Sequence, residues 1–299
     1  MTAVQLTAKP PSGGLRHRIL KATPYLLLIP GLLWLLIFFV VPTIQMFTYS
    51  ISKGSIDTGG FKLAWTADNY ATAIARYGKQ FGNSIIFGGL ATVFTLLIGF
   101  PVAYTIAFRG GRYKNLLLFI VIAPFFTSFL IRTISWQILL GDEGPVLGPL
   151  KHVLHILPNE FSVIGTGISQ LAGLTYNFLP FMILPLYVAL EKIDIRLIEA
   201  GHDLYASNWH AFRKITLPLA LPGVFAGTLL TFIPAMGDYV NAELLGNTQT
   251  QMIGNVIQQR LIIQGDYPVG SALSFILMTA ILVAVAIYAR VLGTEQLTG

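Results

Sequence analysis

Cysteine is absent from this 299-residue sequence, and charged residues are scarce. Without cysteine the chain can form no disulfide, no thiolate nucleophile and no cysteine-ligated metal site. Charged residues make up 11% of the sequence, whereas a soluble domain carries about 25%. Hydrophobic residues make up 54%, and the mean hydropathy is +0.69. Because so few charges cannot cover a surface that faces water, the composition indicates a membrane protein.

Motifs of nucleotide hydrolysis and of common membrane enzymes are also missing. No Gly-x-x-x-x-Gly-Lys-Ser/Thr run occurs, so the chain lacks the usual phosphate-cradling loop. The His-Glu-x-x-His and Gly-x-Ser-x-Gly motifs are absent as well, and no pair of carboxylates falls within a long apolar segment. His152 and His155 have a spacing that metals can use, but no third ligand accompanies them. We therefore expect no enzymatic activity, no metal and no cofactor in this chain.

Six long apolar segments predict an all-α membrane protein with six transmembrane helices. A helix of about 20 apolar residues crosses a hydrocarbon core of roughly 30 Å, and these runs lack the period-two alternation of barrel strands. Five of them contain no Asp, Glu, Lys or Arg, and the third contains Arg132. The segments are Tyr25–Tyr49, Phe81–Phe108, Asn115–Leu140, Phe161–Leu190, Ile215–Gly237 and Val269–Ala289.

The distribution of Lys and Arg predicts a topology with both termini in the cytoplasm. With the N-terminus inside, the cytoplasmic segments carry about twice as many Lys and Arg residues as the opposite side, as the positive-inside rule requires. The basic pI near 9.5 is therefore a sign of topology rather than of nucleic-acid binding. We expect a basic N-terminal segment at 1–23, a membrane domain at 24–292 and a short tail at 293–299.

The longest predicted cytoplasmic connection, about 191–214, has the pattern of two short helices. Its first half carries apolar residues at helical spacing among charged ones. Ser207 can cap a second helix that contains Trp209 and Phe212. Exposed aromatic residues beside charges suit either a protein partner or the lipid headgroup layer, and the pattern alone does not separate the two.

The same loop resembles the "EAA" loop of ABC importer permeases, which reads Glu-Ala-Ala, three residues, Gly, about nine residues, then Ile-x-Leu-Pro. Here the corresponding stretches are Glu199 to Ser207 and Ile215 to Pro218. The resemblance implies that the loop seats in a cleft of a separate ATP-binding subunit. Gly201 replaces the second alanine of the pattern and Tyr205 replaces its glycine, so the bend of this loop need not follow the family's. The residues implied to couple to the ATPase are Glu199, Ala200, Gly201, Asp203, Leu204, Tyr205, Ala206, Ser207 and Trp209.

Motifs elsewhere in the sequence resemble the first permease of spermidine/putrescine importers over roughly residues 80–290. The matching stretches are Pro124-Phe125, Leu130-Ile131-Arg132-Thr133 with Trp136, Leu179-Pro180-Phe181-Met182, Pro185-Leu186-Tyr187, Pro222-Gly223, Ile233 to Gly237 and Ile253 to Ile257.

The resemblance implies the ABC importer permease fold, one half of a pore in a prokaryotic cytoplasmic membrane, and inward transport of polyamines. It also implies a second permease subunit, two ATPase subunits that bind ATP and Mg²⁺, and an external solute-binding protein. Two alternatives stay open. The cargo could be a sugar, polyol, iron or inorganic anion, or the chain could be an ion-coupled secondary transporter, although carboxylates are missing from its spans.

A polycation passing through the protein would need carboxylates and aromatic faces along its path. Asp238 ends the fifth span, roughly 33 Å along the helix from Thr216, and Tyr239 and Glu243 follow it. Trp136 and Tyr176 lie toward different depths of the third and fourth spans in this reading. We expect these five residues, Asp238, Tyr239, Glu243, Trp136 and Tyr176, as candidates for the substrate pathway, with solvated loops and bundle packing as the simpler alternatives.

For two further residues, Arg132 and Pro180, we predict structural or gating roles. A charge at the bilayer centre costs about 2.5–3.5 kcal/mol. If the third span is one straight helix, Arg132 lies roughly 25 Å from Asn115, near the outer boundary. There it could snorkel, and we expect an ion pair with an acid such as Asp238 or Glu143. Pro180 interrupts the hydrogen bonding of the fourth span and can mark a bend near the pathway.

The fifth span contains a Gly-x-x-x-Gly motif at Gly223 and Gly227. Such a motif lets two helices approach closely. We expect the close contact within the bundle, with a second permease subunit as the alternative.

Overall fold

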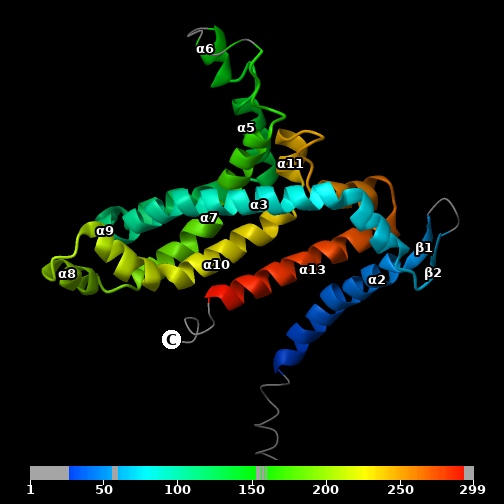
Figure 1. Ribbon diagram of the computed structural model, residues 1–299, viewed down its shortest axis with the longest axis horizontal. Helices are drawn as coiled ribbons and strands as arrows, with labels where there is room; N and C mark the ends of the chain where they lie inside the picture. The colour runs from blue at the N-terminus through cyan, green and yellow to red at the C-terminus, as the bar shows by residue number, and fades with distance from the viewer. Residues whose placement is uncertain (1–26, 56–59, 153–155, 157, 159, 293–299) are drawn as a thin grey trace, which may run out of the picture.

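The computed structural model of the chain describes residues 27–55, 60–152, 156, 158 and 160–292. The expected basic segment at 1–23 and the tail at 293–299 lie outside the described residues. Figure 1 shows long helices running beside one another along the longest axis of the molecule.

Within the described residues, five continuous helices are long and apolar enough to cross a membrane. Each corresponds to a predicted span, although α3 begins before Phe81 and α7 begins after Phe161. In chain order they are Leu27–Ser50, which contains η1 (Leu36–Val40) and α2 (Val41–Ser50), then α3 (Asp68–Arg109), α7 (Gly167–Glu191), α10 (Leu217–Met236) and α13 (Tyr267–Leu292).

The third predicted span is broken, so the expectation of one straight helix over Asn115–Leu140 is wrong. After η2 (Gly111–Tyr113), α4 (Lys114–Ile122) continues into η3 (Ala123–Phe126), and α5 (Phe129–Leu139) then leaves at 94°. The cause is local. Thr127 is extended, and both its backbone N–H and its Oγ1 donate to the carbonyl of Pro124, at 3.2 and 2.7 Å. These bonds close a turn where a straight helix would continue.

Small residues bring α3, α7 and α10 close together. A Cβ on Gly223 would lie 2.6 Å from Ala189 Cβ, and one on Gly227 would lie 2.7 Å from Met182 Sδ. A Cβ on Gly99 of α3 would lie 3.2 Å from Ile183 Cγ1. The Gly-x-x-x-Gly motif therefore serves packing within the bundle, as expected.

The helix α7 lies between α3 and α10 and supplies most of the core. Met182, Ile183, Leu186 and Leu190 of this helix are almost fully buried. Pro180 is also buried, and it does not interrupt α7, which is a single helix from Gly167 to Glu191. Pro180 is therefore part of the packed interior of the bundle.

Shorter elements gather at the two ends of the bundle (Figure 1). One end, called the loop end below, carries α8 (Ile195–Asp203), α9 (Asn208–Ala211) and η4 (Phe212–Thr216). The opposite, hairpin end carries the antiparallel strands β1 (Ser52–Ser55) and β2 (Gly60–Leu63), in which Ser52 pairs with Leu63. Toward this end also lie α11 (Val240–Leu245), α12 (Ile253–Gln258) and η5 (Gln259–Ile263). The helices α5 and α6 (Leu147–His152) project sideways from the bundle.

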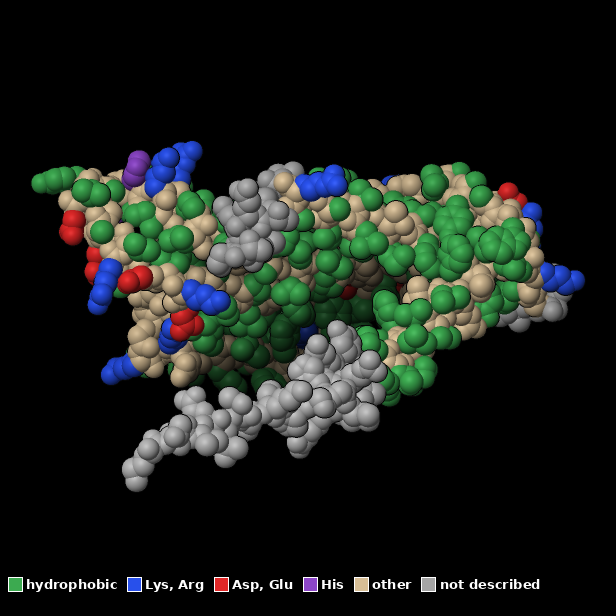
Figure 2. Space-filling view, turned by 90° about the horizontal axis from the view of Figure 1, so that it is seen from below, with side chains coloured by type: hydrophobic (Ala, Val, Ile, Leu, Met, Phe, Trp, Pro, Cys, Tyr) green, Lys and Arg blue, Asp and Glu red, His purple; other side chains and the backbone are tan. Residues whose placement is uncertain are grey.

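On the face seen in Figure 2, the surface between the two ends is mostly apolar. Figure 2 shows most of the visible charged side chains near the ends of the long axis, with hydrophobic side chains and a hollow between them. This distribution fits a bundle whose long axis crosses the bilayer, because charges are costly in hydrocarbon.

Candidate coupling loop and buried polar cluster

The loop end consists of two capped helices that lead directly into a span. Asp194 Oδ1 accepts the backbone N–H of Arg196 at 3.0 Å and starts α8. Ser207 Oγ accepts the N–H of His210 at 3.3 Å and starts α9, so the cap expected at Ser207 is confirmed. From Asn208 the chain stays helical through η4 and α10 to Met236. A displacement of α9 is therefore a displacement of the whole span.

The candidate coupling residues present apolar side chains to the outside. Leu204 is 82% exposed, Tyr205 is 99% exposed and Trp209 is 68% exposed. Trp209 stacks on Phe212 at 5.5 Å, and Phe212 contacts Phe100 of α3 edge-on at 5.5 Å. Glu199, Ala200 and Asp203 are exposed as well. A hollow of about 540 Å³ lies between the two helices, lined by Gly201, Leu204, Tyr205, Ala206, Ser207, His210 and Ile215.

The two departures from the family pattern have different physical causes. Gly201 lies inside α8, where a Cβ would be 2.8 Å from Ile215 Cδ1, so a larger residue would require the end of that flexible side chain to move. Tyr205 has a φ of 62°, in the left-handed region that a glycine adopts without strain. For a residue with a Cβ this conformation costs about 1–2 kcal/mol. The left-handed bend that glycine makes in the family pattern is thus present here, but a tyrosine adopts it with strain.

A second candidate site is a cluster of polar side chains buried where α5, α7 and α11 meet. Asn177 Nδ2 donates to Thr133 Oγ1 and to Asn241 Oδ1, both at 3.0 Å. All three residues are fully buried. Asp238 accepts the backbone N–H of Asn241 at 2.8 Å, and burial raises the pKa of its carboxyl to about 6.

Neither Asn177 nor Asn241 was named from the sequence, and Thr133 was given no role in a site. One feature of the sequence could have indicated the cluster: Asn177 lies in an apolar segment, where a polar amide is costly unless it has a hydrogen-bond partner. Asn177 lies ten residues after Gly167, about 15 Å into α7. The cluster is therefore well inside the bundle.

The other pathway candidates lie around this cluster in two separate contacts. Glu243 Oε2 accepts from Asn255 Nδ2 at 3.1 Å, and the same amide donates to the carbonyl of Tyr239 at 3.0 Å. Trp136 and Tyr176 meet edge to face, with ring centroids 5.4 Å apart. The expectation that these two rings lie at different depths is wrong, because the bend before α5 brings Trp136 against α7.

The ion pair expected for Arg132 is not present among the described residues. Asp238 is engaged with Asn241, and Glu143 Oε1 lies 3.5 Å from His152 Nε2. The guanidinium of Arg132 instead lies over the rings of Phe125 and Phe129, at 5.3 and 5.6 Å. The neighbouring Thr133 bonds to Asn177 inside the bundle.

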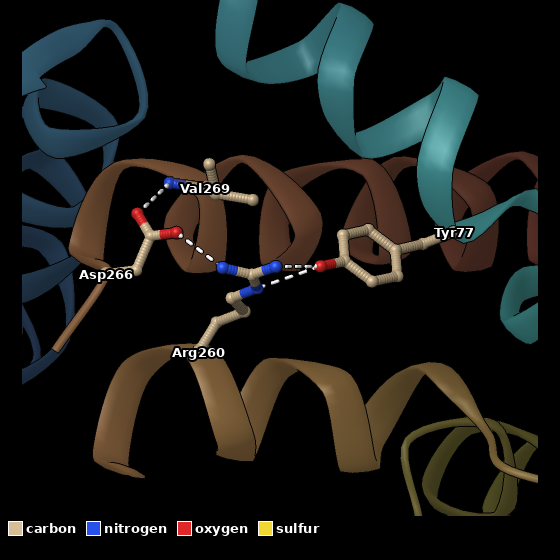
Figure 3. A network of polar contacts seen from close by, with 4 residues as sticks. All are labelled: Tyr77, Arg260, Asp266 and Val269. Carbon is tan, nitrogen blue, oxygen red and sulfur yellow. Dashed lines mark hydrogen bonds and ion pairs between the residues drawn. The ribbon is translucent and has the colours of Figure 1, made fainter. Parts of the chain in front are cut away.

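A different arginine, Arg260, is fully engaged at the hairpin end (Figure 3). Its Nη1 contacts Asp266 Oδ2 at 3.0 Å, and its Nε donates to the Tyr77 hydroxyl at 2.8 Å, with a further bond from Nη2. Tyr77 marks a kink in α3, with a φ of −117°. Asp266 Oδ1 also accepts the N–H of Val269 at the start of α13. The network therefore joins α3, η5 and α13.

Comparison with known proteins identifies the family to which this chain belongs. Residues 95–292 match the family model described as "Binding-protein-dependent transport system inner membrane component". The chain belongs to this family. The matched region runs from the second half of α3 to the end of α13, so it includes both the loop end and the buried polar cluster.

Relatives of the permease match it over most of its length. It is 37% identical to the spermidine/putrescine transport system permease protein PotB of Haemophilus influenzae, over 86% of this chain and 90% of that protein. It is 33% identical to the protein of the same name from Escherichia coli K12, over 86% of this chain and 93% of that protein.

Solved structures share the fold of the permease. A chain of a bacterial ABC transporter that imports the acidic polysaccharide alginate superposes with a TM-score of 0.75 at 17% identity, over 93% of this chain and 98% of that one. The MetNI methionine ABC transporter in an inward-facing conformation gives 0.56 at 19% identity, over 72% of this chain and 94% of that one. The permease therefore has the fold of ABC importer permeases and is a multi-pass bacterial inner-membrane protein.

Proposed function

We propose that this permease is one half of the pore of an ATP-driven importer that carries polyamines inward. The loop end faces the cytoplasm in this proposal, and both termini lie on that side. ATP and Mg²⁺ are bound by two separate ATPase subunits rather than by this chain. A second permease completes the pore, and an external solute-binding protein delivers the cargo.

The exposed surface of the loop end is the observation that carries the coupling role. Leu204, Tyr205 and Trp209 expose most of their area on two capped helices, and no described residue covers them. Aromatic and aliphatic anchors with a charged rim are typical of protein interfaces. Because α9 continues into α10, closure of an ATPase dimer on this surface moves a rod of about 43 Å. Rigid-body movement of packed helices is a usual way to switch a transporter.

The cargo proposal rests on the relatives and on the chemistry near the far end of that rod. Both PotB relatives are named for spermidine and putrescine. Asp238 supplies a carboxylate immediately beyond α10, and Tyr239 lies partly exposed beside it. A carboxylate with aromatic faces suits an organic polycation.

A reconstituted importer tests this function. The permease would be purified with its second permease and ATPase subunits, placed in liposomes and supplied with the cognate binding protein. Spermidine and putrescine are expected to stimulate ATP hydrolysis and to accumulate inside, whereas sugars, iron and inorganic anions are not. Stimulation by one of those solutes alone overturns the cargo. Uptake by the purified chain without an ATPase overturns the ABC mechanism.

A further inference from the structure

The starting observation is a strained tryptophan at the hairpin end. Trp65 has a φ of 46°, in the left-handed region, and its side chain is 77% exposed. Among the described residues, one other non-glycine residue has a positive φ: Tyr205 of the loop end, which is 99% exposed. Backbone strain persists only where the surrounding structure enforces it, and it is concentrated at functional sites. The described chain therefore holds an exposed aromatic ring in a costly conformation at each end of the bundle.

Hydrogen bonds on both sides of Trp65 hold it in this conformation. The backbone N–H groups of Ala64 and Thr66 donate to one shared acceptor, the carbonyl of Ile51, at 3.4 and 3.3 Å. Asn69 Nδ2 donates to the carbonyls on either side of Ile51, both at 2.9 Å. Because the chain is tied down before and after Trp65, the exposed ring extends from a fixed base. A side chain that is already positioned loses little freedom when a partner binds it.

The hairpin beside Trp65 carries an unbalanced positive charge. Lys53 and Lys62 lie directly opposite one another in β1 and β2, and like charges in opposing positions destabilise a strand pair. Lys53 Nζ pairs with Asp68 Oδ2 at 2.7 Å. Lys62 is exposed and forms no ion pair with a described residue. Trp65 therefore lies near a cation that lacks an anion, and a complementary occupant brings an acidic surface.

We infer that the hairpin is the docking surface for the external solute-binding protein, with Trp65 as the anchor and Lys62 opposite an acidic rim of that protein. The inference rests on the proposed function, in which the loop end faces the cytoplasm and the hairpin end therefore faces outward. Tryptophan is enriched among the few residues that carry most of the binding energy of an interface. Each end of the permease then presents one strained aromatic ring to the soluble partner on its own side of the membrane.

Substitution of Trp65 tests the anchor in the assembled importer. The complex of both permeases and the ATPase subunits would be placed in nanodiscs, and its Kd for the solute-binding protein measured. Trp65→Ala is expected to raise this Kd by about tenfold or more, and Trp65→Phe is expected to keep most of the affinity. Trp34→Ala is the matched control, because Trp34 is 64% exposed on the first span, and it is expected to change nothing. An equal Kd for Trp65→Ala and the parent overturns the inference.

A stability measurement separates docking from a structural role. Because the ring of Trp65 is exposed, Trp65→Ala and Trp65→Phe are expected to melt at the same temperature as the parent when the solute-binding protein is absent. A lower melting temperature of Trp65→Ala shows that the ring serves the fold and overturns the inference.

Reversal of Lys62 tests the charge. Lys62→Glu is expected to slow association with the solute-binding protein by about tenfold at low salt, and the difference is expected to disappear near 1 M salt, where charges are screened. Lys192→Glu, which reverses an exposed lysine at the loop end, is the matched control and is expected to leave association unchanged. Association of Lys62→Glu at the parent's rate refutes an acidic occupant.

Cross-linking identifies the occupant and distinguishes this inference from the proposed function. The chain has no cysteine, so a single cysteine can be labelled cleanly with a photoreactive maleimide. Leu63→Cys, at a position that is 52% exposed and two residues before Trp65, is expected to cross-link to the solute-binding protein. Leu204→Cys on the coupling loop is expected to cross-link to the ATPase. A Leu63→Cys product with the second permease, or with lipid alone, refutes the docking surface and leaves the ABC mechanism standing. Failure of Leu204→Cys to reach an ATPase refutes the coupling role.

Discussion

At the loop end, Leu204, Tyr205 and Trp209 lie almost fully in the open, whereas at the polar cluster Thr133, Asn177 and Asn241 are fully buried. The loop-end side chains make few contacts within the chain, and the cluster side chains make most of theirs there. The difference indicates that the loop end is a surface awaiting another protein, while the cluster is part of what holds the chain together.

Arg132 belongs to neither of these two groups. It lies next to the buried cluster in sequence, and its Nε and Nη1 are buried but make no hydrogen bond to a described residue, whereas Arg260 is bonded to Tyr77 and Asp266. Variants in the two regions should therefore separate into those that lose partners and those that lose stability, and five predictions test that separation.

The largest expected effect is at the coupling loop. Glu199→Lys or Trp209→Ala is expected to lower transport by about tenfold or more, because interface anchors carry most of the binding energy. Membrane insertion and melting temperature are expected to stay unchanged. Uptake and ATPase assays on proteoliposomes measure the loss. Unchanged transport in both variants removes the loop from its proposed role.

The polar cluster is expected to show the opposite behaviour. Asn177→Leu leaves the buried Thr133 and Asn241 without their shared donor, and it is expected to lower the free energy of unfolding by about 1–3 kcal/mol. Asn115→Leu, which changes an exposed asparagine on α4, is the matched control. Thermal unfolding in detergent measures both. An equal effect of the two variants contradicts a special role for the cluster.

The Arg260 network is expected to contribute somewhat less. Arg260→Met removes the partner of Tyr77 and Asp266, and because the ion pair is partly exposed we expect a loss of about 1–2 kcal/mol. Tyr77→Phe removes only the hydroxyl and is expected to cost about half as much. If Arg260→Met leaves the melting temperature unchanged, the network does not stabilise the fold.

The titration of Asp238 is expected to have a small effect with a definite sign. Because burial raises its pKa to about 6, the folded state binds a proton more readily than the unfolded state. This group therefore stabilises the fold by about 1 kcal/mol more at pH 5 than at pH 7. In Asp238→Asn that part of the pH dependence is expected to vanish, as melting curves of the two proteins across this range will show. Identical pH dependence of both proteins contradicts a buried carboxyl.

The smallest expected change in stability belongs to Tyr205→Gly. Glycine relieves a left-handed strain of about 1–2 kcal/mol but loses about 0.5–1 kcal/mol more conformational entropy on folding, so the net gain in stability is expected to be below about 1 kcal/mol. The loss of an exposed aromatic anchor is nevertheless expected to weaken ATPase binding, and Tyr205→Phe is expected to preserve it. A pull-down of the ATPase with each variant provides the comparison, and full binding by Tyr205→Gly would show that the ring is dispensable.

Hydropathy was sufficient to predict the long helices and the short, capped helix after Ser207. The periodic placement of apolar residues and a capping serine are local properties, and both act over a few residues. Gly223 and Gly227 were likewise recognisable, because a helix surface without side chains has one main structural use in a membrane.

The bend at Thr127 was not predictable in the same way. Its two bonds to the Pro124 carbonyl lie inside a continuous apolar run, and hydropathy carries no information about direction. Each wrong expectation around the polar cluster follows from missing the bend at Thr127. The ion pair of Arg132 and the separation of Trp136 from Tyr176 both assumed a straight helix. The contact between Tyr77 and Arg260 joins residues 183 positions apart, which no local pattern connects.

The close packing at Gly223 has a mechanical consequence. This residue lies about 22 Å along the helix from Asn208 and about 21 Å from Gly237, so this close contact with α7 is near the middle of the rod, and Gly227 makes a second close contact beside it. A rod that tilts about its midpoint moves its two tips by equal distances in opposite directions. If the helix pivots there, a push on Trp209 toward one side swings Asp238 toward the other, and the contact at Gly223 acts as the fulcrum of a balanced lever.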